Sequence, residues 1–212
     1  KLSSIGEALE KVALNSEGQA DERVASLMSL AKLKYDRMGA VLAKLESSFG
    51  ELPVELGGPV IQLVSDVDED RAIDLIKYTL ASGQQTTQQA AISTLGKMKS
   101  RRASDLLASL LGKMNANDFQ ANLRLDVSLA ANGRTEENVI EQLAAYVAAT
   151  VDPNELATVY ADAMIGGDDT KGSNVFYGKT EVSCVRCHRI DGTGGQVGPE
   201  LSGIGKTKDR LY

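Results

Sequence analysis

Five consecutive residues near the C-terminal end of the chain, Cys184-Val185-Arg186-Cys187-His188, have the types and the spacing needed for haem chemistry. Two thiols separated by two residues and followed at once by an imidazole form a c-type haem attachment motif. The thiols of Cys184 and Cys187 would add to the two vinyl groups of the porphyrin, and His188 would ligate the iron. The chain contains no other cysteine or histidine, so the clustering of all three favours one shared function.

Three other uses of the cysteine pair fit less well. A structural zinc site needs four ligands, and no other cysteine or histidine is present to complete it. A thioredoxin-like pair sits between a strand and a helix of a βαβ unit, whereas this motif follows a short helical stretch and precedes a Gly-rich loop. The third alternative is a pair of buried structural thiols. Haem attachment accounts for the residues better than any of these.

The sequence around the motif resembles the class I cytochrome c family over roughly residues 166–212. Gly167-Asp168 and Lys171-Gly172-Ser173-Asn174-Val175-Phe176 stand before it, and Gly198-Pro199-Glu200-Leu201 stands after it, in the order and spacing of that family. The resemblance implies that the Gly-Pro turn lies on the proximal face of the haem. The carbonyl of Pro199 would then accept the free ring N–H of His188, and Leu201 would pack on the porphyrin. Arg186 and Arg189 are candidates for neutralising the haem propionates.

The elements before this region are predicted to be short paired helices, because apolar residues recur at helical spacing from about Asp21 to Ile165. Helices are expected over Arg23–Lys34, Arg37–Leu45, Asp70–Leu80, Thr87–Lys99, Ala103–Met114, Phe119–Ala131, Thr135–Ala149 and from Asp152-Pro153 onward. Gly50–Pro59 is expected to be a loop, and Thr86 to open a capping box. A left-handed C-cap is expected at Asn132-Gly133. Weak self-similarity between residues 27–34 and 92–99 resembles HEAT-type repeats, with an irregular helical bundle as the alternative.

The expected fold class is therefore all-α, with two domains. Residues 1–164 are predicted to form a HEAT-like helical repeat domain, and residues 165–212 the N-terminal part of a cytochrome c domain. A helical array that runs directly into such a motif resembles the haem-binding domain of large planctomycete- and verrucomicrobium-type proteins. That resemblance implies a fragment of a longer periplasmic or otherwise exported protein that carries haem c, an iron cofactor.

The resemblance implies electron transfer, with a redox partner protein or a fused dehydrogenase domain as the partner. The module itself is not expected to be catalytic, although the full-length protein could be a sugar or alcohol dehydrogenase by analogy. The alternative function is a haem-containing scaffold or ligand sensor whose repeats bind a partner. Peroxidase-like catalysis ranks last, because no distal acid-base groups stand out.

Two elements of the cytochrome pattern are missing from the sequence. No methionine follows His188 to act as the distal iron ligand, and no C-terminal helix follows the Gly-Pro turn. Truncation is the simplest explanation, and the sixth ligand stays open, with Lys206 as one candidate if the chain ended at Tyr212.

The composition narrows the remaining classes of function. A net charge of -6 and a pI near 4.9 disfavour nucleic-acid binding, which relies on a basic surface. No stretch approaches the roughly 20 apolar residues that cross a bilayer, so no membrane span is expected.

Overall fold

The computed structural model describes residues 2–210, which are mostly helical with almost no strand, so the all-α fold class is confirmed. The described residues form twelve α-helices, four short 3-10 helices and one two-stranded hairpin. The chain divides into two compact units, Lys1–Ala149 and Thr150–Tyr212. The boundary between the two units therefore lies before Met164, near which the change in amino-acid composition predicted a domain boundary. None of the helices in residues 2–210 has both the length and the apolar character that crossing a membrane requires.

Nine α-helices and two 3-10 helices belong to the first unit. They are α1 (Leu2–Ala13), α2 (Ala20–Lys32), α3 (Met38–Ser47), η1 (Phe49–Glu51), α4 (Val54–Ser65), α5 (Glu69–Ser82), α6 (Gln85–Lys97), α7 (Arg101–Asn115), η2 (Ala121–Leu123), α8 (Arg124–Ala131) and α9 (Glu137–Thr150). Periodicity predicted most of these helices to within a few residues. It did not predict α1, which precedes the region where the helical pattern was recognised.

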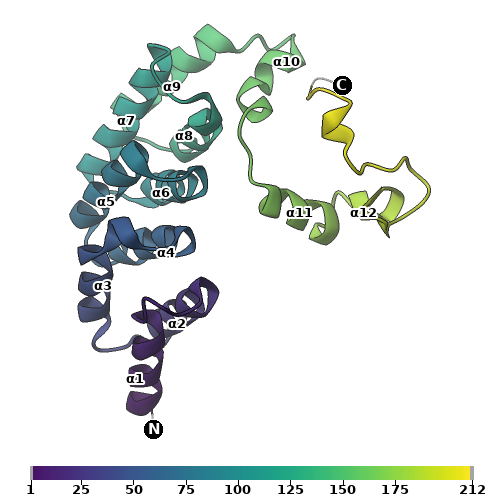
Figure 1. The fold of residues 1–212 in the computed structure, drawn as a ribbon. Coiled ribbons are helices and arrows are strands. Elements are labelled where there is room, and N and C mark those ends of the chain that lie inside the picture. The colour runs from purple at the N-terminus through teal and green to yellow at the C-terminus, as the bar shows by residue number, and fades with distance from the viewer. Residues whose placement is uncertain (1, 211–212) are drawn as a thin grey trace. The chain divides into compact units, whose positions relative to one another are not determined.

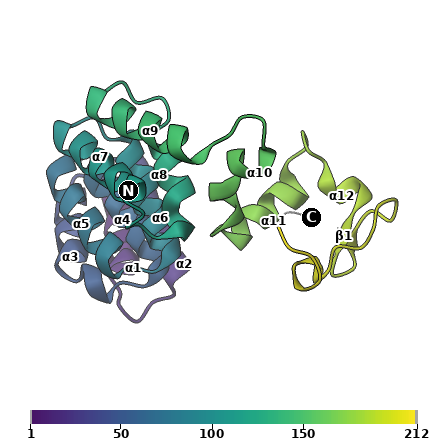
Figure 2. The ribbon, with the colours of Figure 1, turned by 90° about the horizontal axis from the view of Figure 1, so that it is seen from above.

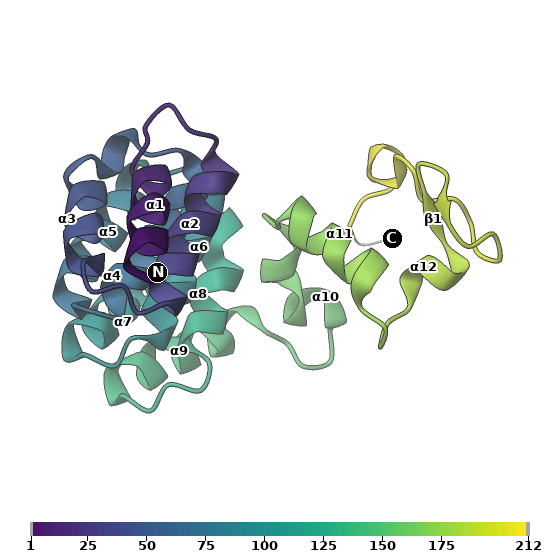
Figure 3. The same cartoon turned by 90° about the horizontal axis from the view of Figure 1, so that it is seen from below.

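The helices of the first unit stack in two rows. The even-numbered helices contact one another in series, α2 with α4, α4 with α6, and α6 with α8. Odd-numbered helices α3, α5 and α7 lie along the other side. Helix α3 contacts α4, α5 contacts α4 and α6, and α7 contacts α6 and α8. Figure 1 shows the two rows side by side, and the views in Figure 2 and Figure 3 separate them in the same way. Each helix therefore buries one face against its partner and another against the next pair.

A continuous hydrophobic core runs through this stack, from Ala13 on α1 to Tyr146 on α9. Leu27, Leu56, Ile92 and Leu107 are fully buried members from four successive pairs. Burying a large aliphatic side chain contributes roughly 1.5–3 kcal/mol, so packing between pairs is the main source of stability. Close approach of the even row depends on small residues: a Cβ on Gly96 of α6 would lie 2.9 Å from Cα of Ala130 on α8.

The predicted loop over Gly50–Pro59 is wrong in its second half, because α4 begins at Val54 and runs through Gly57, Gly58 and Pro59. In a helix interior, propensity disfavours glycine by about 1 kcal/mol and proline by about 3 kcal/mol relative to alanine. The burial of this segment in the core outweighs these unfavourable propensities, and the helix forms. Gly57 and Gly58 are themselves buried and let α6 approach closely, and the apolar side chains of α4 fill the core around them.

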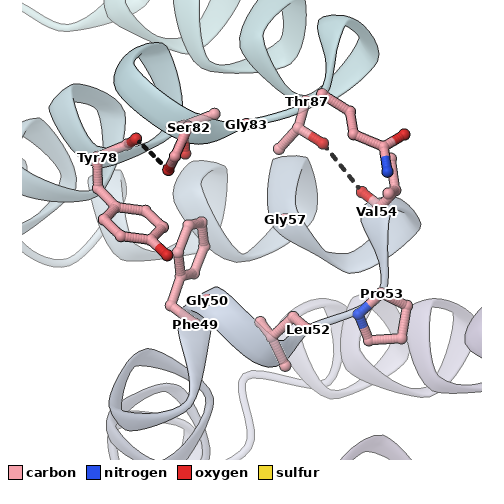
Figure 4. Close-up of a pocket in the computed structure, with 12 residues that line it drawn as sticks. Phe49, Gly50, Leu52, Pro53, Val54, Gly57, Tyr78, Ser82, Gly83 and Thr87 are labelled. Carbon is pink, nitrogen blue, oxygen red and sulfur yellow. Dashed lines mark hydrogen bonds between the residues drawn. The ribbon is translucent and has the colours of Figure 1, made fainter.

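The predicted capping box at Thr86 is also wrong. Helix α6 begins at Gln85 with Gln84 as its N-cap, and no side chain caps it. Figure 4 shows that Thr87 instead points at the start of α4, where its hydroxyl donates to the carbonyl oxygen of Val54 at 3.4 Å. The same close-up shows Phe49 and Tyr78 in an edge-to-face contact, with ring centroids 6.0 Å apart. The capping box does not form, because α6 begins one residue before Thr86 and the side-chain amide of Gln89 donates to the carboxylate of Asp126 at 3.1 Å instead of reaching back to the helix start.

Other predicted helix ends had mixed outcomes. Gly133 has a φ of +82°, which confirms a left-handed residue after α8. Asp152-Pro153 does not begin a helix, because α10 starts only at Leu156 with Glu155 as its N-cap. The amide of Asn154 instead donates to the side chain of Asp152 at 2.9 Å, as in an Asx turn.

The second unit consists of short elements joined by turns. They are α10 (Leu156–Val159), η3 (Ala161–Met164), α11 (Asp169–Gly178), α12 (Cys184–Cys187), β1 (Arg189–Ile190), β2 (Thr193–Gly194) and η4 (Ile204–Lys206). Arg210 joins the C-terminal part of the unit to the segment just before α11, because its guanidinium donates to the carbonyl oxygens of Met164 at 2.5 Å and Gly166 at 3.2 Å. No residue in the described range 150–210 is buried, in contrast to the first unit.

Candidate functional site

The cysteine motif forms a single helical turn, α12. Ser183, just before it, has a φ of +49°, so the chain enters the turn through a left-handed residue. Cys184 and Cys187 occupy the two ends of the turn, and neither is in a disulfide. Residues three apart on a helix share a face, so both side chains project from the same side of α12.

His188 leaves this turn in an extended conformation, while its backbone N–H donates to the carbonyl oxygen of Cys184 at 3.0 Å. Its ring nitrogen Nδ1 lies 3.0 Å from the carbonyl oxygen of Pro199. A carbonyl can only accept a hydrogen bond, so Nδ1 carries a proton in this contact. The contact that the sequence placed between Pro199 and His188 is present, and it leaves Nε2 as the ring nitrogen available for ligation.

The imidazole of His188 lies directly on the backbone of Gly198. A Cβ at residue 198 would lie 2.7 Å from Cε1 and 2.8 Å from Nδ1 of the ring. Glycine is therefore required by the close approach of the ring, not by an unusual φ. Gly198 also donates its N–H to the carbonyl oxygen of Cys187 at 2.7 Å, which fixes the Gly-Pro turn against the helical turn.

Two further contacts hold residues 200–202 beside the strand that follows His188. The N–H of Leu201 donates to the carbonyl oxygen of Arg189 at 2.9 Å, and Arg189 forms an ion pair with Glu200. The hydrogen bond from the Ser202 hydroxyl, together with the nearby Arg189 guanidinium, lowers the pKa of Glu200 from its ordinary value. The Ser202 hydroxyl oxygen also accepts the N–H of Asp191 at 2.6 Å. Hydrogen bonds therefore attach the segment that carries Pro199 to residues that precede and follow His188 in the sequence.

A tight hairpin follows the motif and packs back onto it. Its strands β1 and β2 are joined by Asp191-Gly192, both with positive φ, at +49° and +80°, as a type I′ turn requires. Beyond β2, the N–H of Gly195 donates to the carbonyl oxygens of Val185 at 2.8 Å and His188 at 3.2 Å. A Cβ at Gly195 would overlap the carbonyl oxygen of Arg186, so only glycine fits here.

Helix α11 supports the other side of α12, with which it is in contact. The carboxylate of Asp168 caps it by accepting the N–H of Lys171 at 2.9 Å. That hydrogen bond, with a smaller contribution from the Lys171 charge, lowers the pKa of Asp168 from its ordinary value. At the other end of α11, Tyr177 donates its hydroxyl to the carbonyl oxygen of Ile190 at 3.4 Å, which joins the helix to the hairpin.

Apolar side chains in the second unit remain on its surface. Val197, next to the Gly-Pro turn, is 88% exposed, and Val175, Val182 and Ile204 are also exposed. Exposed apolar residues in so small a unit are candidates for covering an apolar group.

The donor set of this site fits a haem better than a bare metal ion. Within residues 2–210, no three His, Cys, Asp or Glu side chains converge in an arrangement that could hold a metal ion. A haem iron does not need such a cluster, because the porphyrin supplies four nitrogen ligands and the protein needs to supply only an axial one. His188 is oriented for that role.

The residues singled out in the sequence mostly come together. Cys184, Cys187, His188 and Pro199 form one connected group, and Leu201 follows with its backbone hydrogen-bonded to Arg189. Lys206 lies in the short helix η4 with its side chain exposed.

Sequence reasoning missed two supporting features of the site. Gly195 was missed, although the run Gly192-Thr193-Gly194-Gly195 is a visible signal of close backbone approach. Arg189 was considered a partner for haem propionates, yet it pairs with Glu200.

Comparisons with known proteins add no assignment to these observations. No protein-family model matches the chain, and neither a curated protein nor a solved structure matches it.

Proposed function

We propose that this chain is an electron-transfer module that carries a haem attached covalently to Cys184 and Cys187, with His188 as an axial ligand of the iron. The observation that carries the proposal is the 3.0 Å contact between Nδ1 of His188 and the carbonyl oxygen of Pro199. Ligating histidines commonly donate their second ring N–H to a carbonyl, which fixes the ring and raises the basicity of the ligand nitrogen. Two thiols on one helical turn beside such a histidine favour haem over other ligands.

The residues of the site have distinct roles under this proposal. Each thiol adds across one vinyl group: sulfur bonds to one vinyl carbon, the thiol hydrogen goes to the other, and nothing leaves. His188 presents Nε2, Pro199 orients the ring through Nδ1, and Gly198 leaves room for the imidazole. Leu201 and the exposed apolar side chains would cover the porphyrin. When bound, the haem supplies a one-electron couple between ferric and ferrous iron.

We also propose that the first unit is a HEAT-like repeat array that positions the haem domain against its electron partner. The alternating rows of helices support this interpretation, because stacked helix pairs that contact only their neighbours are the organisation of helical repeat proteins. The partner would be a redox protein or a dehydrogenase domain of the same polypeptide.

The proposed family and location rest on the sequence alone. The chain resembles the class I cytochrome c family and, more specifically, the haem-binding domain that follows HEAT-like repeats in planctomycete- and verrucomicrobium-type proteins. Covalent attachment of haem takes place outside the cytoplasm in that family, so a periplasmic or exported location is part of the proposal.

A spectroelectrochemical titration of the haem-loaded chain tests the function. The expected result is a single reversible one-electron wave, which His188→Gly should shift or abolish. Gly205→Ala, where a Cβ meets nothing within 4 Å, serves as the matched control and should leave the axial ligand intact. Haem that loads but shows no reversible wave would contradict electron transfer and would instead favour a sensor.

A further inference from the structure

A second candidate site lies in the first unit, far along the sequence from the cysteine motif. A pocket of about 430 Å³ is formed where the end of α1, helix α2, the end of α3 and the start of α4 meet. Its lining includes the charged side chains of Arg23, Lys44 and Glu51 and the apolar side chains of Leu14, Leu45 and Leu52. Pockets of roughly 300–1,000 Å³ that mix apolar walls with a few polar groups are typical of small-molecule sites.

Arg23 is the unusual member of this lining, because it is only 4% exposed. Its Nε donates to the carbonyl oxygen of Ala13 at 3.2 Å, which satisfies a carbonyl at the C-terminal end of α1. Within residues 2–210, neither of its Nη atoms has a hydrogen-bond partner, and no carboxylate forms an ion pair with it. A buried guanidinium normally has a counter-charge. The two Nη atoms of Arg23 are not sealed from solvent, so a partner outside the chain can reach them from the pocket.

The other charges of the pocket indicate what that partner is. Lys44 and Glu51 are both exposed residues. The two positive charges of Arg23 and Lys44 exceed the single negative charge of Glu51, so the pocket carries a net charge of one positive unit. The two Nη atoms of an arginine match the two oxygens of a carboxylate. Glu51 disfavours a dianion such as a phosphate, and the leucine side chains favour a hydrocarbon body.

From these contacts we propose that the pocket binds a small monocarboxylate whose carboxylate contacts Arg23 and whose apolar portion packs against Leu14, Leu45 and Leu52. This function is separate from haem attachment and depends on none of its residues. The array would thereby combine a metabolite-binding pocket with the proposed docking role.

Isothermal titration calorimetry of the full chain with butyrate tests the proposal, and butyramide and inorganic phosphate serve as comparison ligands. Saturable butyrate binding is expected below roughly 5 mM, with neither comparison ligand binding as tightly. Arg23→Gln should weaken it by at least about thirtyfold, as loss of a buried charge partner does. Because this variant could also unfold, two exposed positions provide independent tests.

Lys44→Gln should weaken butyrate binding by roughly two- to fivefold, and Glu51→Gln should strengthen it by a similar factor, since both act through partly solvated charge. Lys32→Gln, at an exposed position outside the pocket, is the control and should change nothing. Absent binding, tighter binding of phosphate or butyramide, or equal affinity in all four variants would overturn the proposal.

Discussion

Replacing Gly198 by alanine perturbs the histidine of the proposed haem site without removing any functional group. The new Cβ would lie 2.7 Å from Cε1 of His188, whereas carbon atoms in ordinary contact are about 3.5–4.0 Å apart. The ring must therefore move by roughly 0.8 Å, and because Gly198 adjoins Pro199, this movement also separates Nδ1 from its acceptor. From 3.0 Å, such a shift takes the contact beyond hydrogen-bonding distance.

The sign and size of the effect on the reduction potential follow from that lost bond. Donation from Nδ1 makes the imidazole a stronger donor to iron and stabilises the ferric state more than the ferrous state. Losing a bond worth about 1 kcal/mol in the ferric state alone would raise the potential by up to about 40 mV, since 59 mV corresponds to a tenfold change for one electron.

The assay is spectroelectrochemistry of the haem-loaded Gly198→Ala variant beside Gly205→Ala. Gly205 is the matched control, because a Cβ there meets nothing within 4 Å and its φ is not positive. The expected result is a raised potential in the first variant and an unchanged one in the second. Equal potentials and identical spectra in the two variants would refute the argument that Gly198 and Pro199 position His188.

Three further predictions concern other parts of the molecule. Gly195→Ala should reduce haem incorporation more than about tenfold while leaving the helical circular dichroism of the first unit intact, because its Cβ overlaps the backbone of the motif; a fully loaded variant would contradict this. The hydrogen bond from Arg134 lowers the pKa of Glu136 to about 2, so stability from this pair should be complete above about pH 4.5 and disappear as the pH falls toward 2. In urea titrations, Glu136→Gln should reduce the loss of unfolding free energy between pH 4.5 and 2 by about 1–2 kcal/mol. An unchanged dependence of that free energy on pH would show that the pair does not stabilise the fold. Leu95→Ala, in the core, should cost about 2–5 kcal/mol in the same assay, whereas Leu129→Ala, 61% exposed, should cost little; equal losses would show that the core is misassigned.

Much of the first unit could be predicted from the sequence, because its helices carry a strong apolar period and bury one face. Helix α4 was missed at Gly57, Gly58 and Pro59, where local propensity and tertiary packing disagree and burial against α6 outweighs propensity. The Thr86 capping box failed for a related reason, since the side chain of Gln89 donates to Asp126, which lies thirty-seven residues away in the sequence. Long-range contacts of this kind leave no local pattern.

More of the candidate site could be predicted, because residues close together in the sequence define it. Cys184, Cys187 and His188 lie within five residues, and the Pro199 contact followed from the family pattern around them. The Arg189–Glu200 pair was not predicted, since ion pairs between separate segments depend on how those segments pack. The same limit applies to Arg23, whose burial among four helices has no signature in the sequence around it.

The intact mass of the chain, expressed with a c-type haem maturation system, is the decisive measurement for covalent haem attachment. The expected mass is that of the chain plus one haem, retained after denaturation, with a haem band in the reduced pyridine spectrum. Both should vanish when Cys184→Ala and Cys187→Ala are combined. A folded wild-type chain with an unmodified mass and no haem band would rule out covalent attachment and leave a helical protein without its proposed cofactor.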